Sequence, residues 1–191
     1  MNTPAHLIFG VAAFGRPDSP RVTVAALAGA LTPDLSLYLL AGWALVVQGL
    51  PPQTVFGTLY YSDAWQAIFR VDNSIPLWAL ALAAGAWARS PVAVAFAGAG
   101  LLHLVCDFPL HHDDARAHFW PLGDWVFVSP VSYWDPAHHG RVAGTIEALV
   151  SLALAVWLWR RFRSLAMRAL IGLLAVAELL PAILFALVFS A

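Results

Sequence analysis

The segment HLVCDFPLHHDDARAH, from His103 to His118, concentrates imidazoles and carboxylates in a chain that is otherwise apolar. It follows residues 92–102, a run with almost no polar side chain. His103 and Asp107 are one helical turn apart, so both project from the same face of a helix. A histidine and an aspartate on one face, with more of both just beyond, are typical of a divalent-metal site. We therefore expect the rest of the chain to bring further ligands to this point.

The composition indicates an integral membrane protein. Of the 191 residues, 61% are hydrophobic and only 11% are charged, and the mean hydropathy is +0.74. A soluble domain carries roughly 25% charged residues. The lipid bilayer is thus the expected partner, and a net charge of −1 gives no reason to expect nucleic acid. The single cysteine, Cys106, cannot form an internal disulfide.

Proline and capping signals predict an all-α fold, a polytopic membrane helix bundle that forms a single domain over residues 1–191. We expect about five to six crossing helices plus short half-helices at the N-terminus. The expected helices cover residues 3–14, 22–31, 32–48, 75–88, 92–108, 142–159 and 165–189, the last two being C-terminal transmembrane helices.

Two segments between these helices are less regular. Residues 54–70 mix aromatic and polar side chains and fit either a distorted crossing or an interfacial helix. Residues 109–141 are rich in Trp, Pro, His and Asp and predict an irregular loop over the site. This loop would form the lid or the substrate wall.

Tracing the helices across the membrane places the acids and histidines on one side and most arginines on the other. His6, Asp34, Asp72 and Glu147 converge on the same side as the segment that begins at His103. The opposite side collects seven of the ten basic residues, namely Arg16, Arg21, Arg89, Arg160, Arg161, Arg163 and Arg168. By the positive-inside rule, the site faces the periplasm from a multi-pass protein of the inner membrane.

Buried acids and imidazoles predict a cation, because each costs several kcal/mol in hydrocarbon without a partner. The predicted ligands are His6, Asp34, His103, Asp107, His112 and His118. The histidines at 111, 112 and 118 cannot all bind directly, and a solvated loop is the alternative for each. Mixed nitrogen and oxygen donors favour zinc, with manganese or iron as alternatives.

A bound metal would leave room for chemistry. It lowers the pKa of a bound water toward ~7 and so supplies a nucleophile. Glu147, Asp72 or Asp113 would serve as general base or as further ligands, and Arg116 would hold a phosphate. The competing interpretation is structural. His103 and Asp107 would then be a hydrogen-bonded pair in a bundle, and Asp34 an acid favoured by a helix N-terminus.

Several motifs resemble the membrane-bound metal-dependent hydrolases of the LexA-regulated inner-membrane type. They span residues 1–147 and comprise Pro-Ala-His6, Leu-Thr-Pro-Asp34-Leu, Asp72-Asn73-Ser74, His103-x-x-x-Asp107 and Phe119-Trp120-Pro121. The resemblance implies metal ligands at His6, Asp34, His103 and Asp107. The family usually has Thr-His-Ser where this chain has Asp72-Asn73-Ser74, so one ligand is missing or replaced, by Asp72, His111, His112 or His118.

The ligand order is also similar, more faintly, to that of zinc-dependent phospholipase C, which implies a phosphoester or phospholipid substrate. The leading hypothesis is a metal-dependent hydrolase acting on the non-cytoplasmic side. The alternative is a non-catalytic membrane protein that binds or transports a metal, or binds haem. A transporter requires a path to both sides, whereas a hydrolase requires a cavity that opens on one side.

Overall fold

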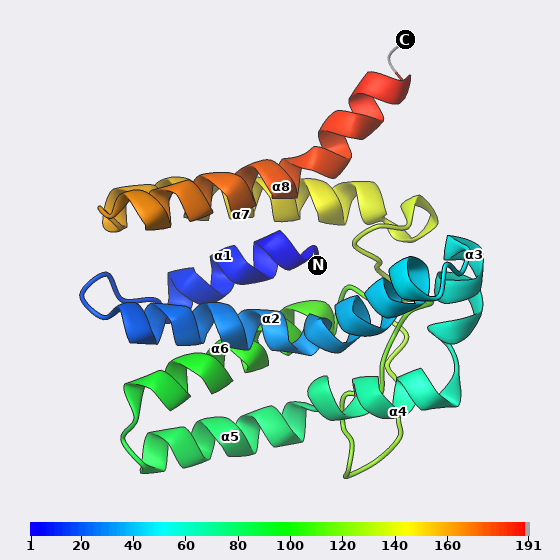
Figure 1. The fold of residues 1–191 in the computed structure, drawn as a ribbon, viewed down its shortest axis with the longest axis horizontal. Coiled ribbons are helices and arrows are strands. Elements are labelled where there is room, and N and C mark those ends of the chain that lie inside the picture. The colour runs from blue at the N-terminus through cyan, green and yellow to red at the C-terminus, as the bar shows by residue number, and fades with distance from the viewer. Residues whose placement is uncertain (190–191) are drawn as a thin grey trace.

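The computed structural model describes residues 1–189, with side chains through residue 180, and every regular element in that range is a helix (Figure 1). The all-α prediction is therefore confirmed for the described residues. The elements are α1 Thr3–Phe14, α2 Pro20–Gly42 with a π-helical extension Trp43–Val47, α3 Pro52–Thr54 with a π-helical turn Val55–Leu59, α4 Asp63–Asp72, α5 Ile75–Trp87, α6 Pro91–Asp107, a 3-10 turn Pro136–His138, α7 Gly140–Arg161 and α8 Leu165–Phe189.

Three helices within the described residues are long and apolar enough to cross a membrane, fewer than the five to six that the sequence predicts. They are Pro20–Val47, Asp63–Trp87 and Gly140–Arg161. The helices α1 and α6 are apolar but shorter. The predicted crossing at 165–189 forms α8, but its side chains from residue 181 onward lie outside the described part. Within the described residues, three helices are therefore compatible with membrane crossing, fewer than expected.

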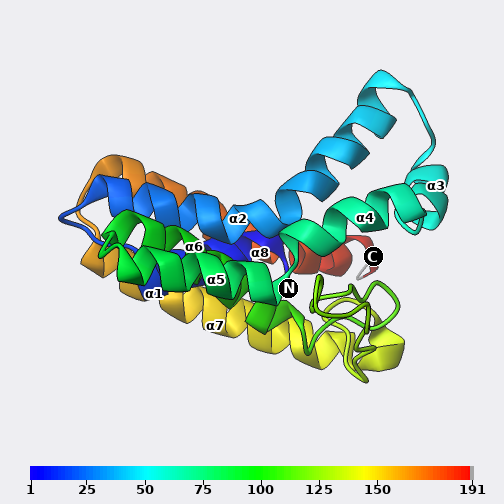
Figure 2. The same ribbon diagram turned by 90° about the horizontal axis from the view of Figure 1, so that it is seen from below.

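The predicted break between residues 31 and 32 is wrong, because α2 continues through it. Pro33 lies inside α2, and Thr32 Oγ1 donates to the carbonyl of Ala28 at 2.7 Å instead of capping a new helix. A proline inside a membrane helix is tolerated when neighbouring groups satisfy the freed carbonyls. The helix changes direction about halfway along (Figure 2), as expected of a proline kink. The Thr-Pro-Asp signal therefore marks a bend.

A second interruption lies between α4 and α5, which together form one candidate span. Ser74 caps α5, where its Oγ accepts the N–H of Leu77 at 3.2 Å, and this confirms the predicted helix start. Asn73 Nδ2 donates to the carbonyl of Pro33 at 3.2 Å. The break in one span thus contacts the kink in another. It also follows that the second half of residues 54–70 belongs to a candidate crossing.

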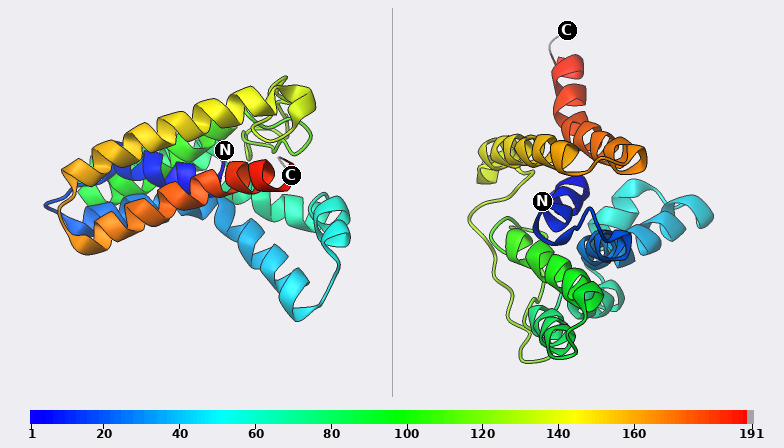
Figure 3. Two further views of the ribbon diagram at one scale, coloured as in Figure 1. Left: turned by 90° about the horizontal axis from the view of Figure 1, so that it is seen from above. Right: turned by 90° about the vertical axis from the view of Figure 1, so that its left-hand side faces the viewer.

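The helix α1 lies at the centre, enclosed by α2, α6, α7 and α8 (Figure 3). Small residues allow this close approach. A Cβ at Gly29 would overlap the backbone of Phe96 on α6, and a Cβ at Gly10 would lie 2.7 Å from Ala30. The helices α1, α2 and α6 are therefore packed at backbone contact over this half of the bundle.

The two ends of the molecule differ in character. The loops α1–α2, α5–α6 and α7–α8, which hold Arg16, Arg89 and Arg163, lie together at one end (Figure 1). The opposite end carries α3 and the irregular loop of residues 108–135. The predicted separation of the arginine-rich turns from the His/Asp-rich loop is therefore present in the fold.

Candidate metal centre

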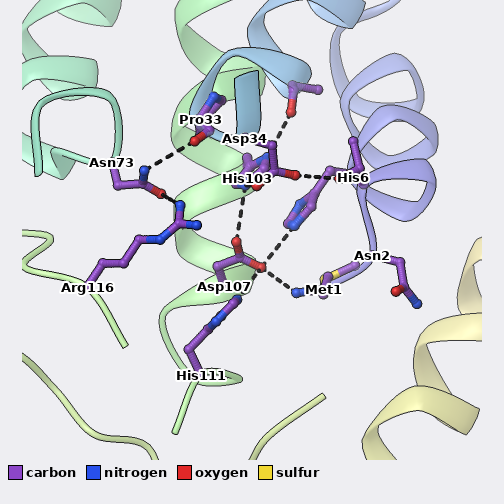
Figure 4. Close-up of polar contacts among 12 residues, drawn as sticks. Met1, Asn2, His6, Pro33, Asp34, Asn73, His103, Asp107, His111 and Arg116 are labelled. Atoms are coloured by element: carbon purple, nitrogen blue, oxygen red, sulfur yellow. Dashed lines mark hydrogen bonds and ion pairs between the residues drawn. The ribbon is translucent and has the colours of Figure 1, made fainter. Parts of the chain in front are cut away.

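His6, His103 and Asp107 form a buried group whose ligand atoms lie within 4.8 Å of one another (Figure 4). Their exposed fractions are 2%, 1% and 4%. Asp107 receives both rings, with His6 Nε2 at 2.9 Å from Oδ1 and His103 Nε2 at 3.1 Å from Oδ2. His103 and Asp107 share a face of α6, and His6 reaches them because α1 packs directly against α6. The arrangement can hold a metal ion.

The orientation of His103 is fixed from α2. Its Nδ1 lies 2.7 Å from the carbonyl oxygen of Ala30, which can only accept, so Nδ1 carries the proton. Ala30 lies in the turn before Pro33, where the kink makes carbonyls available to neighbouring side chains. Nε2, the other ring nitrogen, therefore faces Asp107. A hydrogen bond that fixes the tautomer of a metal-binding histidine is the usual support for such a ligand.

The contacts of the cluster are compatible with a bound cation. The carboxylate of Asp107 is approached by the Nε2 atoms of His6 and His103, and all three side chains are buried. A cation between these groups would be held by one ligand atom from each of them. Two imidazoles and a carboxylate suit zinc, manganese or iron.

The two imidazole rings of the cluster are stacked. The ring centroids of His6 and His103 are 3.5 Å apart, with an angle of 9° between the planes. This spacing leaves no room for a porphyrin between the rings. A haem that uses both histidines as opposite axial ligands is therefore incompatible with this arrangement.

Two further residues border the cluster, the predicted ligand Asp34 and the loop residue His111. Asp34 Oδ1 lies 3.7 Å from His103 Nε2, and Asp34 Oδ2 accepts a hydrogen bond from Thr3 Oγ1 at 2.5 Å. His111 Nε2 lies 3.4 Å from Asp107 Oδ1. His111 was the weaker choice among the loop histidines, yet the spacing 103, 107, 111 repeats every four residues and could have identified it.

His111 forms an ion pair with Asp114, whose Oδ2 lies 2.9 Å from His111 Nδ1. Burial alone would lower the pKa of His111, but Asp107 and Asp114 outweigh burial and raise it. Burial would likewise raise the pKa of Asp114, and His111 instead lowers it. His111 thus brings positive charge to the edge of the cluster.

The other two predicted loop ligands lie outside this group. His112 Nδ1 lies 2.6 Å from the carbonyl oxygen of Ser129, and its ring stacks on His138 at 3.6 Å. His118 Nδ1 donates to the carbonyl of Asn73 at 3.0 Å, and burial is the main cause that lowers its pKa. Both contacts stabilise the long loop. Of the three loop histidines, His111 is the one that lies near the cluster.

The predicted general bases are divided between the cavity and the protein interior. Asp113 is exposed on the cavity wall. Asp72 Oδ1 accepts from the Nδ2 of Asn73 at 2.8 Å and does not line the cavity. Glu147 is buried behind the cluster, where its Oε1 accepts the backbone N–H of Asn2 at 2.6 Å. Of these three acids, only Asp113 faces the cavity.

A cavity of about 400 Å³ leads from the cluster toward the end that carries the long loop. Asp34, Asp107 and His111 lie on its lining, while His6 and His103 are buried behind them. Its other lining side chains include Tyr60, Tyr61, Asp113, Asp114, Arg116 and Tyr133.

Arg116 is a buried cation on the wall of this cavity, with 7% of its surface exposed. Its Nη1 donates to Asn73 Oδ1 at 2.9 Å, and its Cζ lies 4.8 Å from the ring centre of Phe69. Burial works against the charge, but Tyr60 and Asp34 raise the pKa of Arg116 above its usual value. Among the described residues, no carboxylate lies within ion-pair distance of it. It therefore has donors left for an anion.

No protein-family model, curated protein or solved structure matches this chain. Its function is therefore inferred from the chemistry of the cavity.

Proposed function

We propose that the protein is an integral-membrane, metal-dependent hydrolase of a phosphoester, with a membrane phospholipid as one such substrate. His6, His103 and Asp107 would hold the metal, and zinc is the ion that their donor set favours. One observation carries the proposal. The buried cluster of two imidazoles and a carboxylate borders the same cavity as Arg116, a buried guanidinium without a carboxylate partner among the described residues. A divalent cation and a guanidinium on one cavity would together bind and orient a phosphate group.

Each cavity residue has a role in this proposal. A bound metal ion supplies a water of lowered pKa and polarises a phosphoryl oxygen. Arg116 orients the phosphate through paired N–H donors, as guanidinium groups do with phosphate oxygens. Asp34, 3.7 Å from His103, and Asp113 are the acids on the cavity lining that can accept a proton from water. Asp34 is the better placed, because Thr3 holds it at the cluster.

The packing favours a hydrolase over a transporter. Toward the arginine-rich end, α2 and α6 meet at backbone contact around Gly29 and Phe96. An ion passing in that direction would have to separate these helices. The resemblance of the His6, Asp34 and His103-x-x-x-Asp107 motifs to membrane metal-dependent hydrolases agrees with this choice.

We further propose that the arginine-rich end faces the cytoplasm and that the cavity opens toward the periplasm. A reporter protein fused after Arg163 should then be active only as a cytoplasmic fusion. A periplasmic signal would reverse this orientation.

The test begins with the purified protein. Elemental analysis should find zinc, manganese or iron, and the protein should hydrolyse p-nitrophenyl phosphate, bis-p-nitrophenyl phosphate or a labelled phospholipid. Arg116→Gln should keep the metal and weaken phosphoester binding, seen as a higher KM. A tightly bound metal without hydrolysis of any of these substrates would favour the non-catalytic metal-binding alternative. The proposal would be overturned if the wild-type protein contained no metal and His103→Ala hydrolysed the substrates as fast as the wild type.

A further inference from the structure

We infer that the arginine-rich end carries a second binding site, for the phosphate group of an anionic phospholipid. The site is a cavity of about 310 Å³ lined by Arg16, Arg89 and Arg161, which come from three different parts of the chain. The chain brings them together because the α1–α2 loop, the α5–α6 loop and the end of α7 meet at this end (Figure 1). No acidic residue lines this cavity in the described part of the chain.

Arg89 occupies a backbone position that favours glycine. Its φ is 51°, in the left-handed region. Arg89 directly follows Ala88, the C-cap residue of α5. The N–H of Arg89 donates to the carbonyl of Ala86, and the N–H of Ser90 donates to the carbonyl of Gly85, both at 3.0 Å. This pair of hydrogen bonds is common at the C-terminus of a helix. Glycine is the usual residue at the left-handed position because a Cβ is disfavoured there. An arginine costs more than glycine at this position, and this is the observation that motivates a role for its side chain.

Arg161 is a fixed guanidinium on the opposite wall. Its Nη1 donates to the carbonyl of Ala12 at 3.2 Å and its Nη2 to that of Gly15 at 2.8 Å. Its Cζ also lies 4.8 Å from the ring centre of Trp157. These contacts hold the charge in place at the end of α1, and two carbonyls do not neutralise it.

Arg16 is positioned by its backbone. Its N–H donates to Thr23 Oγ1 at 2.9 Å, and the same hydroxyl donates to its carbonyl at 2.8 Å. The side chain is exposed and has no ion pair among the described residues. Asp18 lies in the same turn but is exposed and does not line the cavity. Three positive charges therefore share one cavity with no bound counter-charge.

The shape of the lining favours a lipid as the source of the phosphate. The lining also includes the apolar side chains of Phe14, Val22 and Val94. A phospholipid carries both a phosphate and apolar chains and would use both kinds of lining, whereas free phosphate would use only the arginines. Basic pockets between transmembrane helices are the usual binding sites for anionic head groups on the cytoplasmic side. This inference is independent of the metal centre, which lies farther along the bundle.

The test uses the whole protein in phosphatidylcholine–detergent micelles, with thermal melting as the readout. Added phosphatidylglycerol should raise the Tm by several degrees, because a ligand that binds the folded state stabilises it. Added phosphatidylcholine should leave the Tm unchanged. The double variant Arg16→Gln/Arg89→Gln should lose the phosphatidylglycerol shift. The matched control is Arg163→Gln, an exposed arginine at the same end that does not line the cavity, and it should keep the shift.

Arg89→Gly separates binding from folding. Glycine suits the left-handed position, so this variant should melt at or above the wild-type temperature without added lipid, yet show a reduced shift with phosphatidylglycerol. Inorganic phosphate at matched ionic strength should give no shift. If phosphate raised the Tm as much as phosphatidylglycerol does, the ligand of the site would be a free anion and not a lipid. An undiminished lipid shift in the double variant, or an equal loss in Arg163→Gln, would refute the site.

Discussion

The two halves of this protein use the same kind of helix in opposite ways. Toward the arginine-rich end, α1, α6 and the first half of α2 are continuous and meet through small residues such as Gly10 and Gly29. Around the cavity, α2 is bent at Pro33 and the second span is broken at Asn73 and Ser74. Irregular backbone at membrane depth is tolerated where it lines a cavity or is buried in protein. The breaks in α2 and in the second span therefore lie in the half that holds the candidate metal centre and not in the closely packed half.

The largest expected effect is the loss of the metal from the open half. Asp107→Asn and His103→Ala each remove a donor from the cluster, and bound metal measured by elemental analysis should fall to background. His112→Ala removes a histidine that contacts Ser129 instead and should keep the metal content of the wild type. Equal metal in all three variants would place the site elsewhere.

The next effect concerns the packed half. Gly29→Ala adds a Cβ that would overlap the backbone of Phe96, so α2 and α6 must separate. Overpacking of this kind costs roughly 1–3 kcal/mol, which thermal or denaturant unfolding would measure. The control is Gly123→Ala in the long loop, where a Cβ meets nothing within 4 Å. Similar stability of both variants would remove the contrast between the halves.

A third effect tests whether the open half recognises an anion. Arg116→Gln keeps a polar side chain but removes the buried charge, and the KM for a phosphoester should rise about tenfold or more. Bound metal should not change, since Arg116 contacts Asn73 and does not contact the cluster. Arg70→Gln is the matched control, because Arg70 pairs with the exposed Asp124. A KM increase in both variants alike would point to general electrostatics.

The smallest effect is expected at the surface of the open half. Arg70 and Asp124 form an ion pair of 3.4 Å, with side chains 35% and 78% exposed. Exposed pairs contribute about 0.5 kcal/mol or less, and salt screens them. Asp124→Asn should thus leave the melting temperature and the metal content within error of the wild type. A clear loss of either would mean that the long loop depends on this contact.

The sequence predicted the centre of the site better than its surroundings. The spacing of His103 and Asp107 predicts a shared helix face by itself, and the structure places them there. His6 could be placed on the same side of the membrane by tracing the helices, and the resemblance of the motifs suggested it as a ligand, but no local pattern reveals that α1 packs against α6. The sequence left open which of the three loop histidines lies near the cluster, because the path of an irregular loop cannot be read from spacing alone, and the structure places His111 there.

The extent of α2 was also not predicted. Thr32-Pro33-Asp34 has the same appearance at the start of a helix and at a bend within one. What distinguishes them is the tertiary packing around the bend, where Asn73 Nδ2 and His103 Nδ1 donate to the carbonyls of Pro33 and Ala30. The broken span, by contrast, was correctly given a start at residue 75, since Ser74 caps α5 locally.

Pro33 has a consequence that reaches beyond the shape of α2. Replacing it with alanine would give the helix a regular ladder of amide bonds and would look like an improvement by any measure of helix propensity. Yet straightening the turn that holds Ala30 would move its carbonyl relative to the imidazole proton of His103, which it now accepts. The repaired helix would then leave that ring free to rotate or to change which nitrogen it presents. The proline that interrupts α2 thus helps to fix the orientation of His103 on α6.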